Sequence, residues 1–170
     1  MRDFLLEQGV WEREVDEVLS NFNNDVTEDD LVIVAIFDSA FDLGNMYYDL
    51  EGYEYALYWY EKVAMEGNVK AENNLGVIHY KLKDYARSEK WLKIAADNNL
   101  SSACFNLGLL YLNFDRVEEA MESFRKGSVL LSDDCKYNLA ILYSQNGDEK
   151  SAISMYKQLY RSGHKKGCYN

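Results

Sequence analysis

The chain has 170 residues, enough for one domain or one short repeat array. Hydrophobic residues make up 48% and proline is absent, which excludes a disordered chain and favours helices over a loop-rich β fold. The net charge is −11: residues 1–70 hold 17 Asp and Glu against 4 Lys and Arg, whereas residues 71–170 hold 12 against 14. An acidic first part argues against binding nucleic acid or anionic lipid. It either attracts a basic protein or is a solvated surface.

The first residues, 1–7, carry one basic residue and no long apolar run, so no signal peptide is expected. No run of 18 apolar residues occurs, and no membrane contact is predicted. The three cysteines form an odd set without a CxxC pair. A reducing, cytoplasmic setting is therefore expected.

Residues 1–38 precede the repeats described below. Residues 3–20 have the apolar periodicity of an amphipathic helix, and Thr27 begins a second helical segment whose acidic first turn suits a helix N-terminus. The segment is interpreted as an N-terminal helical cap. A docking arm is the alternative.

A period of 32 residues runs through the rest of the chain without a gap. The units are 39–70, 71–102, 103–134 and 135–166, and a stub, 167–170, begins a fifth. Each unit opens on a small residue, followed by Leu at the fourth position after it, Gly or Ala at the fifth and Tyr or His at the eighth. In the second unit these residues are Ala71, Leu75, Gly76 and His79.

These columns lie on one face of a helix, where the glycine lets a second helix approach closely. The second half of each unit carries its own stripe of small and bulky residues, and short polar turns join the two halves. Gly67, Asn99 and Gly163 follow the second helices, where a left-handed cap is expected. The sequence therefore predicts an all-α fold, an α-solenoid (α/α superhelix) of four 32-residue helical hairpins.

The pattern Ala-x-x-Asn-Leu-Gly-x-x-Tyr, then Ala-x-x-Trp and a Gly-Asn before the next Ala, resembles the Sel-one-like repeat, a relative of the tetratricopeptide repeat. Its best matches run from Asn74-Leu75-Gly76 through Trp91, and the resemblance covers about residues 39–166. Units of this family usually exceed 32 residues, and the last two units here lack the tryptophan. The resemblance implies a non-enzymatic protein that binds other proteins.

No catalytic or metal-binding constellation is found. His79 occupies the tyrosine column and is interpreted as a core residue, while His164 lies in a terminal turn without a partner. Cys135 belongs to the small-residue column, and Cys104 and Cys168 lack the spacing of a zinc site. We therefore expect no catalytic residue, no metal and no cofactor.

The resemblance implies that the first helices line a concave groove that holds an extended peptide, often through an asparagine. The matching column is Asp42, Asn74, Asn106 and Asn138, whose amides offer a donor and an acceptor to a peptide main chain. By helical spacing, neighbouring groove residues are Phe41, Tyr48, Asn73, Tyr80, Phe105 and Tyr137. The alternative is structural: the asparagines satisfy backbone groups between hairpins.

The expected function is a protein–protein interaction module, monomeric or weakly self-associating, with another protein or an extended peptide as its partner. Small size and an acidic front favour a dedicated inhibitor or bacterial immunity protein that neutralises a basic toxin, such as a nuclease. The alternatives are a general adaptor or chaperone for secretion, signalling or complex assembly, and a scaffolding fragment of a longer repeat array.

Overall fold

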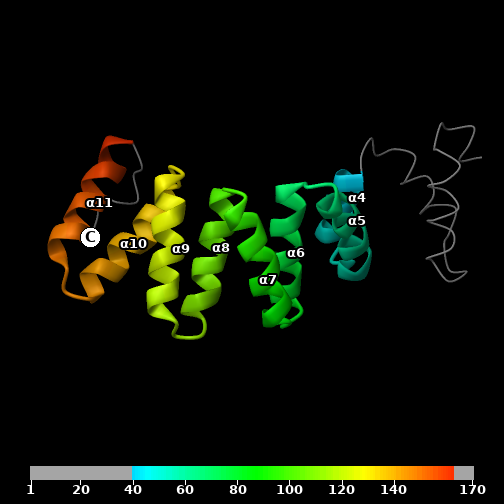
Figure 1. The fold of residues 1–170 in the computed structure, drawn as a ribbon, viewed down its shortest axis with the longest axis horizontal. Coiled ribbons are helices and arrows are strands. Elements are labelled where there is room, and N and C mark those ends of the chain that lie inside the picture. Colours follow the sequence, from blue (N-terminus) through cyan, green and yellow to red (C-terminus); the bar gives the residue numbers. More distant parts are fainter. Residues whose placement is uncertain (1–39, 163–170) are drawn as a thin grey trace, which may run out of the picture. The chain divides into compact units, whose positions relative to one another are not determined.

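The structure of the chain is a computed structural model that describes residues 40–162 (Figure 1). Within that range it contains eight α-helices, numbered α4 to α11, and no strand. The chain divides into two compact units, Met1–Trp59 and Tyr60–Asn170, which are described separately. The predicted N-terminal cap and the stub at 167–170 lie outside the described residues.

The helices form four hairpins, each with a first helix, a short turn and a second helix. The first helices are α4 (Ala40–Asp49), α6 (Val69–Lys81), α8 (Ser101–Leu112) and α10 (Asp133–Gln145). The second helices are α5 (Tyr53–Met65), α7 (Tyr85–Asp97), α9 (Val117–Val129) and α11 (Glu149–Arg161). The predicted all-α solenoid of four helical hairpins is confirmed.

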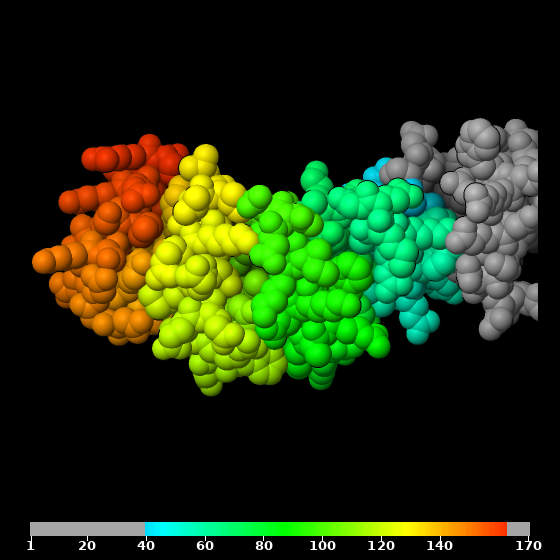
Figure 2. Space-filling view, in the orientation of Figure 1, coloured from blue at the N-terminus to red at the C-terminus, as the bar shows by residue number. Residues whose placement is uncertain are grey.

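In the unit that begins at Tyr60, the second (α6–α7), third (α8–α9) and fourth (α10–α11) hairpins follow one another in chain order (Figure 1). The two helices of each hairpin pack together, and α7 and α9 also pack on the first helix of the hairpin that follows. In the space-filling view the side chains of successive hairpins meet (Figure 2). Each hairpin thus buries one face against the next.

Every turn between the described helices contains one residue with a left-handed backbone. Within hairpins these residues are Glu51, Lys83, Asp115 and Gly147, and between hairpins they are Gly67, Asn99 and Leu131. In the turn after α6, the backbone N–H of Lys83 donates to the Tyr80 carbonyl at 3.0 Å, and that of Asp84 to the His79 carbonyl at 2.8 Å. This Schellman pattern ends the helix.

The left-handed caps predicted at Gly67 and Asn99 are therefore confirmed, with φ angles of 86° and 62°. Gly163 lies outside the described residues. Leu131, with φ 63°, was not predicted, because a branched apolar residue rarely adopts this conformation.

Side chains cap the starts of four helices in the unit from Tyr60 onward. Asn68 Oδ1 accepts from the backbone N–H groups of Lys70 and Ala71, both at 3.1 Å, and Asp84, Ser132 and Asp148 cap in the same way. Because Asn68 and Ser132 precede the small residues that open the repeat units, α6 and α10 begin two residues before Ala71 and Cys135.

The glycine column brings the two helices of a hairpin together. A methyl group on Gly76 would lie 2.6 Å from Leu92 Cγ, and one on Gly108 would lie 2.6 Å from Phe124 Cζ, so neither position has room for a side chain. The fourth hairpin carries Ala140 at this position, opposite the half-buried Tyr156. Its helices therefore accept the methyl group that the second and third hairpins exclude.

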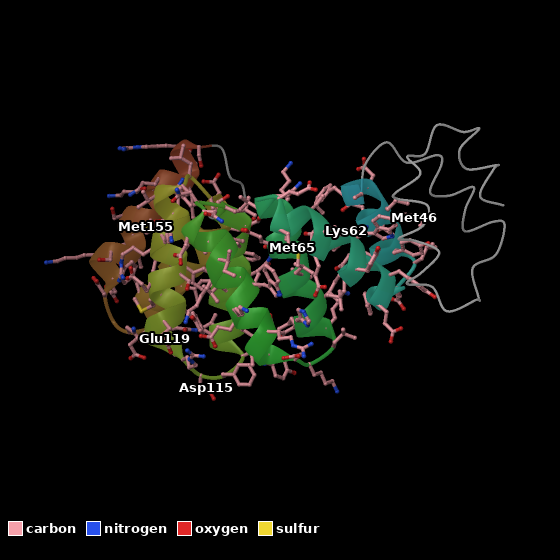
Figure 3. All side chains as sticks on the ribbon, turned by 45° about the vertical axis from the view of Figure 1, so that its right-hand side comes forward. Met46, Lys62, Met65, Asp115, Glu119 and Met155 are labelled. Carbon is pink, nitrogen blue, oxygen red and sulfur yellow. The ribbon has the colours of Figure 1, made fainter. Side chains whose placement is uncertain are left out.

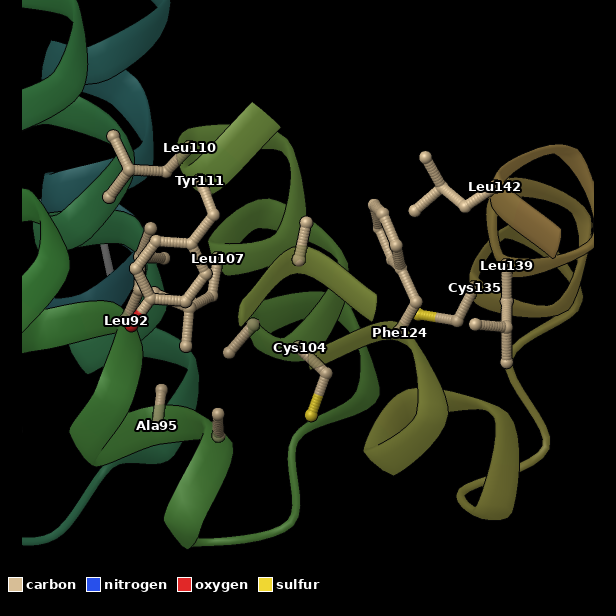
Figure 4. Packing of buried hydrophobic residues seen from close by; sticks show 13 residues of the cluster. Leu92, Ala95, Cys104, Leu107, Leu110, Tyr111, Phe124, Cys135, Leu139 and Leu142 are labelled. Carbon is tan, nitrogen blue, oxygen red and sulfur yellow. The ribbon is translucent and has the colours of Figure 1, made fainter. Parts of the chain in front are cut away.

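The core is continuous from the second hairpin to the fourth. Leu92, Leu107, Phe124 and Leu139 are among its buried members, and Cys104 and Cys135 pack beside them (Figure 4). His79 is 3% exposed and Cys135 is fully buried, which confirms that both are packing residues. Among the described helices, none has the length and hydrophobicity required to cross a membrane.

Candidate functional site

The first helices of the second, third and fourth hairpins form one face, because α8 contacts both α6 and α10. This face carries most of the residues predicted to line the groove. Three other predicted residues belong to α4, in the unit that ends at Trp59: Asp42 is exposed, and Phe41 and Tyr48 are half-buried. The Tyr48 ring lies 6.1 Å from that of Tyr53.

Two predicted asparagines meet across α6 and α8. Asn106 Nδ2 donates to Asn73 Oδ1 at 2.9 Å, and Asn73 Nδ2 donates to Asn74 Oδ1 at 3.3 Å. Among the described residues, no hydrogen-bond partner is found for Asn74 Nδ2 or Asn106 Oδ1, and both residues are half-buried. A donor and an acceptor are therefore present on neighbouring helices, as recognition of a peptide main chain requires.

The remaining predicted residues have local contacts. Asn138 Nδ2 donates to the Asp134 carbonyl within α10 at 2.9 Å, and Tyr137 lies 6.4 Å from the Tyr156 ring. Phe105 packs 6.2 Å from Phe124 and adjoins the core. The asparagine column is thus not uniform: the Asn106 side chain of α8 bonds to a neighbouring first helix, whereas the Asn138 side chain of α10 bonds within its own helix.

A cavity of about 160 Å³ opens beside the asparagine bridge. Its lining consists of Val77, Tyr80, Leu92, Asn106, Leu109 and Leu110. Tyr80 is 40% exposed and Leu109 is 41% exposed, so an apolar surface adjoins the amide of Asn106. Sequence reasoning found Tyr80 and Asn106 but missed Val77 and Leu109, which follow Asn74 and Asn106 by three positions and so share their helix face.

Another cavity, of about 290 Å³, has residues of α7 and α9 on its sides and Cys104, Leu107 and Tyr111 of α8 among its lining. Lys126 of α9 pairs with Asp97 of α7 at 2.8 Å beside it. Because its charged groups, Lys93, Asp97, Glu119, Glu122 and Lys126, include both signs, the cavity does not select a ligand of one charge.

An ionic cluster, the Glu89 cluster (Glu89, Lys93, Tyr111, Arg116 and Glu119), joins the second and third hairpins. Arg116 donates to the Glu89 carboxylate at 2.9 and 3.2 Å and to Glu119 at 2.6 Å, and its guanidinium lies 4.3 Å from the Tyr111 ring centre. Tyr111 Oη and Lys93 Nζ donate to Glu89 at 3.1 and 2.9 Å. Figure 3 places Glu119 near the α8–α9 turn that contains Asp115.

The electrostatics of this cluster indicate a structural role. The hydrogen bonds from Arg116, supported by those from Lys93 and Tyr111, lower the pKa of Glu89 to about 2. Burial raises the pKa of the Tyr111 hydroxyl. A carboxylate that is ionised at every ordinary pH and held by two cations is not poised for proton transfer near neutrality.

Other titratable groups of the core do not form a catalytic set. Burial lowers the pKa of His79, whose Nε2 has no hydrogen-bond partner among the described residues. Burial raises the pKa of Cys104, and raises that of Cys135 to about 11, so both thiols are weak nucleophiles. Within residues 40–162, no group of three or more His, Cys, Asp or Glu side chains could hold a metal ion.

Comparison with known proteins matches two of the hairpins to a repeat family. Residues 101–127 and 134–162 match the tetratricopeptide repeat, and these segments correspond to the third and fourth hairpins. A Sel1 repeat protein from Oxalobacter formigenes is 28% identical, with a TM-score of 0.58 over 73% of this chain and 56% of that one.

Two further proteins are similar. YrrB, whose crystal structure is described as a tetratricopeptide repeat protein with an unusual peptide-binding site, is 25% identical, with a TM-score of 0.51 over 67% of this chain and 62% of that one. Response regulator aspartate phosphatase E of Bacillus subtilis (strain 168) is 26% identical over 155 residues, 76% of this chain. The match spans only 41% of that relative's length.

Proposed function

We propose that the chain, whose third and fourth hairpins match the tetratricopeptide repeat and which is similar to a Sel1 repeat protein, is a non-enzymatic module that holds an extended segment of another protein against α6 and α8. The observation that carries this proposal is the Asn73–Asn106 bridge beside the cavity lined by Val77, Tyr80 and Leu109. Asn74 Nδ2 and Asn106 Oδ1 would bond the main chain of the segment, and the cavity would take one of its apolar side chains.

Three observations support this proposal. The face is continuous, since α8 contacts both α6 and α10. The 160 Å³ cavity holds one side chain but not a drug-sized ligand, for which pockets of about 300–1,000 Å³ are usual. YrrB, a similar protein, is described as having a peptide-binding site.

The experiment is selection of displayed random peptides on the purified full chain. Asn74→Ala/Asn106→Ala should weaken binding of the selected peptides by at least tenfold, because the Asn74 Nδ2 donor and the Asn106 Oδ1 acceptor are lost together. Asn138→Ala, whose amide bonds within its own helix, is the matched control and should change affinity less than twofold. Equal loss in both variants would place the site elsewhere, and selection of no peptide would contradict peptide binding.

Charge supports a narrower proposal, that the chain is a dedicated inhibitor or immunity protein in a reducing cytoplasm and neutralises one basic partner. Residues 40–59 carry Asp42, Asp49, Glu51 and Glu54 and no lysine or arginine. An acidic surface of this kind speeds the capture of a basic protein, and its effect weakens as salt screens it.

The narrower role is tested by affinity capture from the native source at low and moderate salt, followed by mass spectrometry. One basic protein at unit stoichiometry, released at moderate salt, is the expected result. Several partners would favour a general adaptor or chaperone. Recovery of the chain alone would favour a scaffolding fragment and contradict the inhibitor role.

A further inference from the structure

A row of four apolar side chains, three of them exposed and one, Tyr85, half-buried, follows the turns of the second and third hairpins. This turn row comprises Tyr80, Leu82, Tyr85 and Phe114. The ring of Tyr85 lies 5.6 Å from that of Tyr80 and 4.9 Å from that of Phe114, both edge-on, so the row crosses from one hairpin to the next. Leu82 is 48% exposed and Phe114 is 44% exposed. Contiguous apolar surface of this kind usually marks a contact site.

The fold does not require these side chains, as the fourth hairpin demonstrates. Its equivalents of Tyr80, Leu82 and Tyr85, 64 residues later, are Ser144, Asn146 and Glu149. Its turn nevertheless has a left-handed residue, Gly147, at the position equivalent to Lys83, and the same two backbone hydrogen bonds, at 3.1 and 2.9 Å. A polar sequence therefore closes the same turn, and the apolar row of the second and third hairpins needs another explanation.

The turn row continues the apolar lining of the groove, because Tyr80 belongs to both. Side chains two residues apart on one face of an extended chain are separated by about 6.6 Å, which fits within the two ring-to-ring steps of 5.6 and 4.9 Å that make up the row. An extended segment leaving the groove could thus lay two apolar side chains along the row.

Charges at the two ends of the row give this segment a direction. Lys83 is exposed next to Leu82, and Asp115 is exposed next to Phe114. Two charged groups of the same turns are paired: Asp84 with Arg87 at 3.3 Å, and Arg116 with Glu89 and Glu119. The complementary segment carries an acidic residue at its Leu82 end and a basic residue at its Phe114 end.

We infer that the turn row docks an extended segment of the partner protein that has two bulky apolar residues two positions apart, flanked by an acidic residue on one side and a basic residue on the other. This inference rests on the proposed function, since it extends the same groove. It adds the sequence class of the segment and a surface outside the face formed by the first helices.

The probe is a fluorescein-labelled peptide with the central sequence Glu-Leu-Thr-Phe-Lys, titrated with the full chain at low salt. Leu82→Asn/Phe114→Asn, which at both positions copies Asn146 of the fourth hairpin, should weaken binding on the order of tenfold. Ile153→Asn, which removes an apolar side chain that is 51% exposed on α11, is the matched control and should change binding less than twofold. Leu82→Asn alone should give part of the loss, and circular dichroism verifies that each variant is folded.

A separate variant tests the charge assignment. Lys83→Glu should weaken the probe severalfold and strengthen a probe whose acidic residue is replaced by lysine, an exchange that a fold defect would not produce. Equal affinity of the parent and the double variant, or no binding of the probe at millimolar concentration, would overturn the inference. If the probe results overturn the inference but the display-selected peptides still bind in an Asn106-dependent manner, the turn row is rejected as a docking site and peptide binding in the groove is retained. If peptide binding does not depend on Asn106 but the Leu82→Asn/Phe114→Asn variant still weakens the probe, only the proposed groove is rejected.

Discussion

The second and third hairpins share a 32-residue plan with the fourth, but they carry features that the fourth lacks. All three close their turns with one left-handed residue and bury the same leucine column. Of these three, only the second and third hairpins are joined by the Glu89 cluster, and only they carry the turn row. In the fourth hairpin Asp148 caps α11 where Arg116 precedes α9.

This difference separates what the repeat needs from what has been added to it. The fourth hairpin supplies the minimum, which is a capped helix pair with a polar turn. The tight glycine contacts, the ionic cluster and the exposed aromatic residues of the second and third hairpins exceed that minimum. The glycine contacts tighten each of these two hairpins, the Glu89 cluster fixes the junction between them, and the exposed apolar side chains form the surface for which we propose a partner.

The largest effect is expected where the close helix contact is broken. Gly108→Ala forces a methyl group against the buried Phe124 ring and should lower the free energy of unfolding by about 2 kcal/mol. Ala140→Gly, at the same position of the fourth hairpin, should cost only about 1 kcal/mol through helix propensity. Urea denaturation of both variants measures the difference. A neutral Gly108→Ala would mean that the third hairpin is packed no more tightly than the fourth.

Next in size is the loss of the Glu89 cluster. Glu89→Gln should cost about 1 kcal/mol at pH 7, because a carboxylate that accepts from Arg116, Lys93 and Tyr111 loses its charge. The control is Glu122→Gln, whose carboxylate pairs with Arg125 at an exposed position and should contribute less than about 0.5 kcal/mol.

The same variant has a pH signature. Since the folded-state pKa of Glu89, about 2, lies below its ordinary value of 4.5, its contribution is complete above pH 4.5 and is lost as the pH falls toward 2. The stability difference between the parent and Glu89→Gln should therefore shrink over this interval. A difference that stays constant down to pH 2 would contradict the pairing.

A smaller effect is expected at the left-handed turn residues. Leu131→Gly should stabilise the chain by about 0.5–1 kcal/mol, because glycine adopts a φ of 63° without steric cost. Gly147→Ala, in the turn of the fourth hairpin, should destabilise by about 1 kcal/mol. Open space surrounds the site, so the cost comes only from the backbone strain of alanine at a φ of 77°. Thermal unfolding of the pair tests the sign of each change, and a destabilising Leu131→Gly would reveal a packing role for Leu131.

The smallest effect concerns His79, which replaces the tyrosine of the third and fourth hairpins. Burial lowers its pKa below the ordinary 6.5, opposed by Asp84 and Glu61 and assisted by Arg87. The unfolded chain therefore binds a proton more readily, so stability should fall as the pH drops below 6.5. His79→Phe should flatten this dependence between pH 7.5 and 5.5. An unchanged slope would assign it to another group.

Much of the fold follows from local chemistry that the sequence displays. The small, leucine and glycine columns predict the hairpins, and Gly67 and Asn99 predict two of the turns because few other residues tolerate a left-handed backbone. Lys83 and Leu131 adopt the same conformation without that signal. Their conformation is imposed by the helices on either side rather than by residue preference.

The site was less predictable, because it depends on which side chains meet between hairpins. The asparagine column is visible in the sequence, but the Asn73–Asn106 bridge joins different columns of two units. The Glu89–Arg116 pair joins positions that hold Met121 and Asp148 one repeat later, so the period gives no hint of it. Sequence periodicity finds what the repeats share, whereas these contacts arise where the repeats differ.

The most direct test of the central claim, that the additions on the second and third hairpins form the binding surface, is the amide spectrum of ¹⁵N-labelled full chain titrated with the Glu-Leu-Thr-Phe-Lys probe. Shifts should concentrate at residues 77–85 and 106–116 and be absent at residues 141–149, the equivalent part of the fourth hairpin. Shifts centred on the fourth hairpin, or none at saturating probe, would contradict the claim.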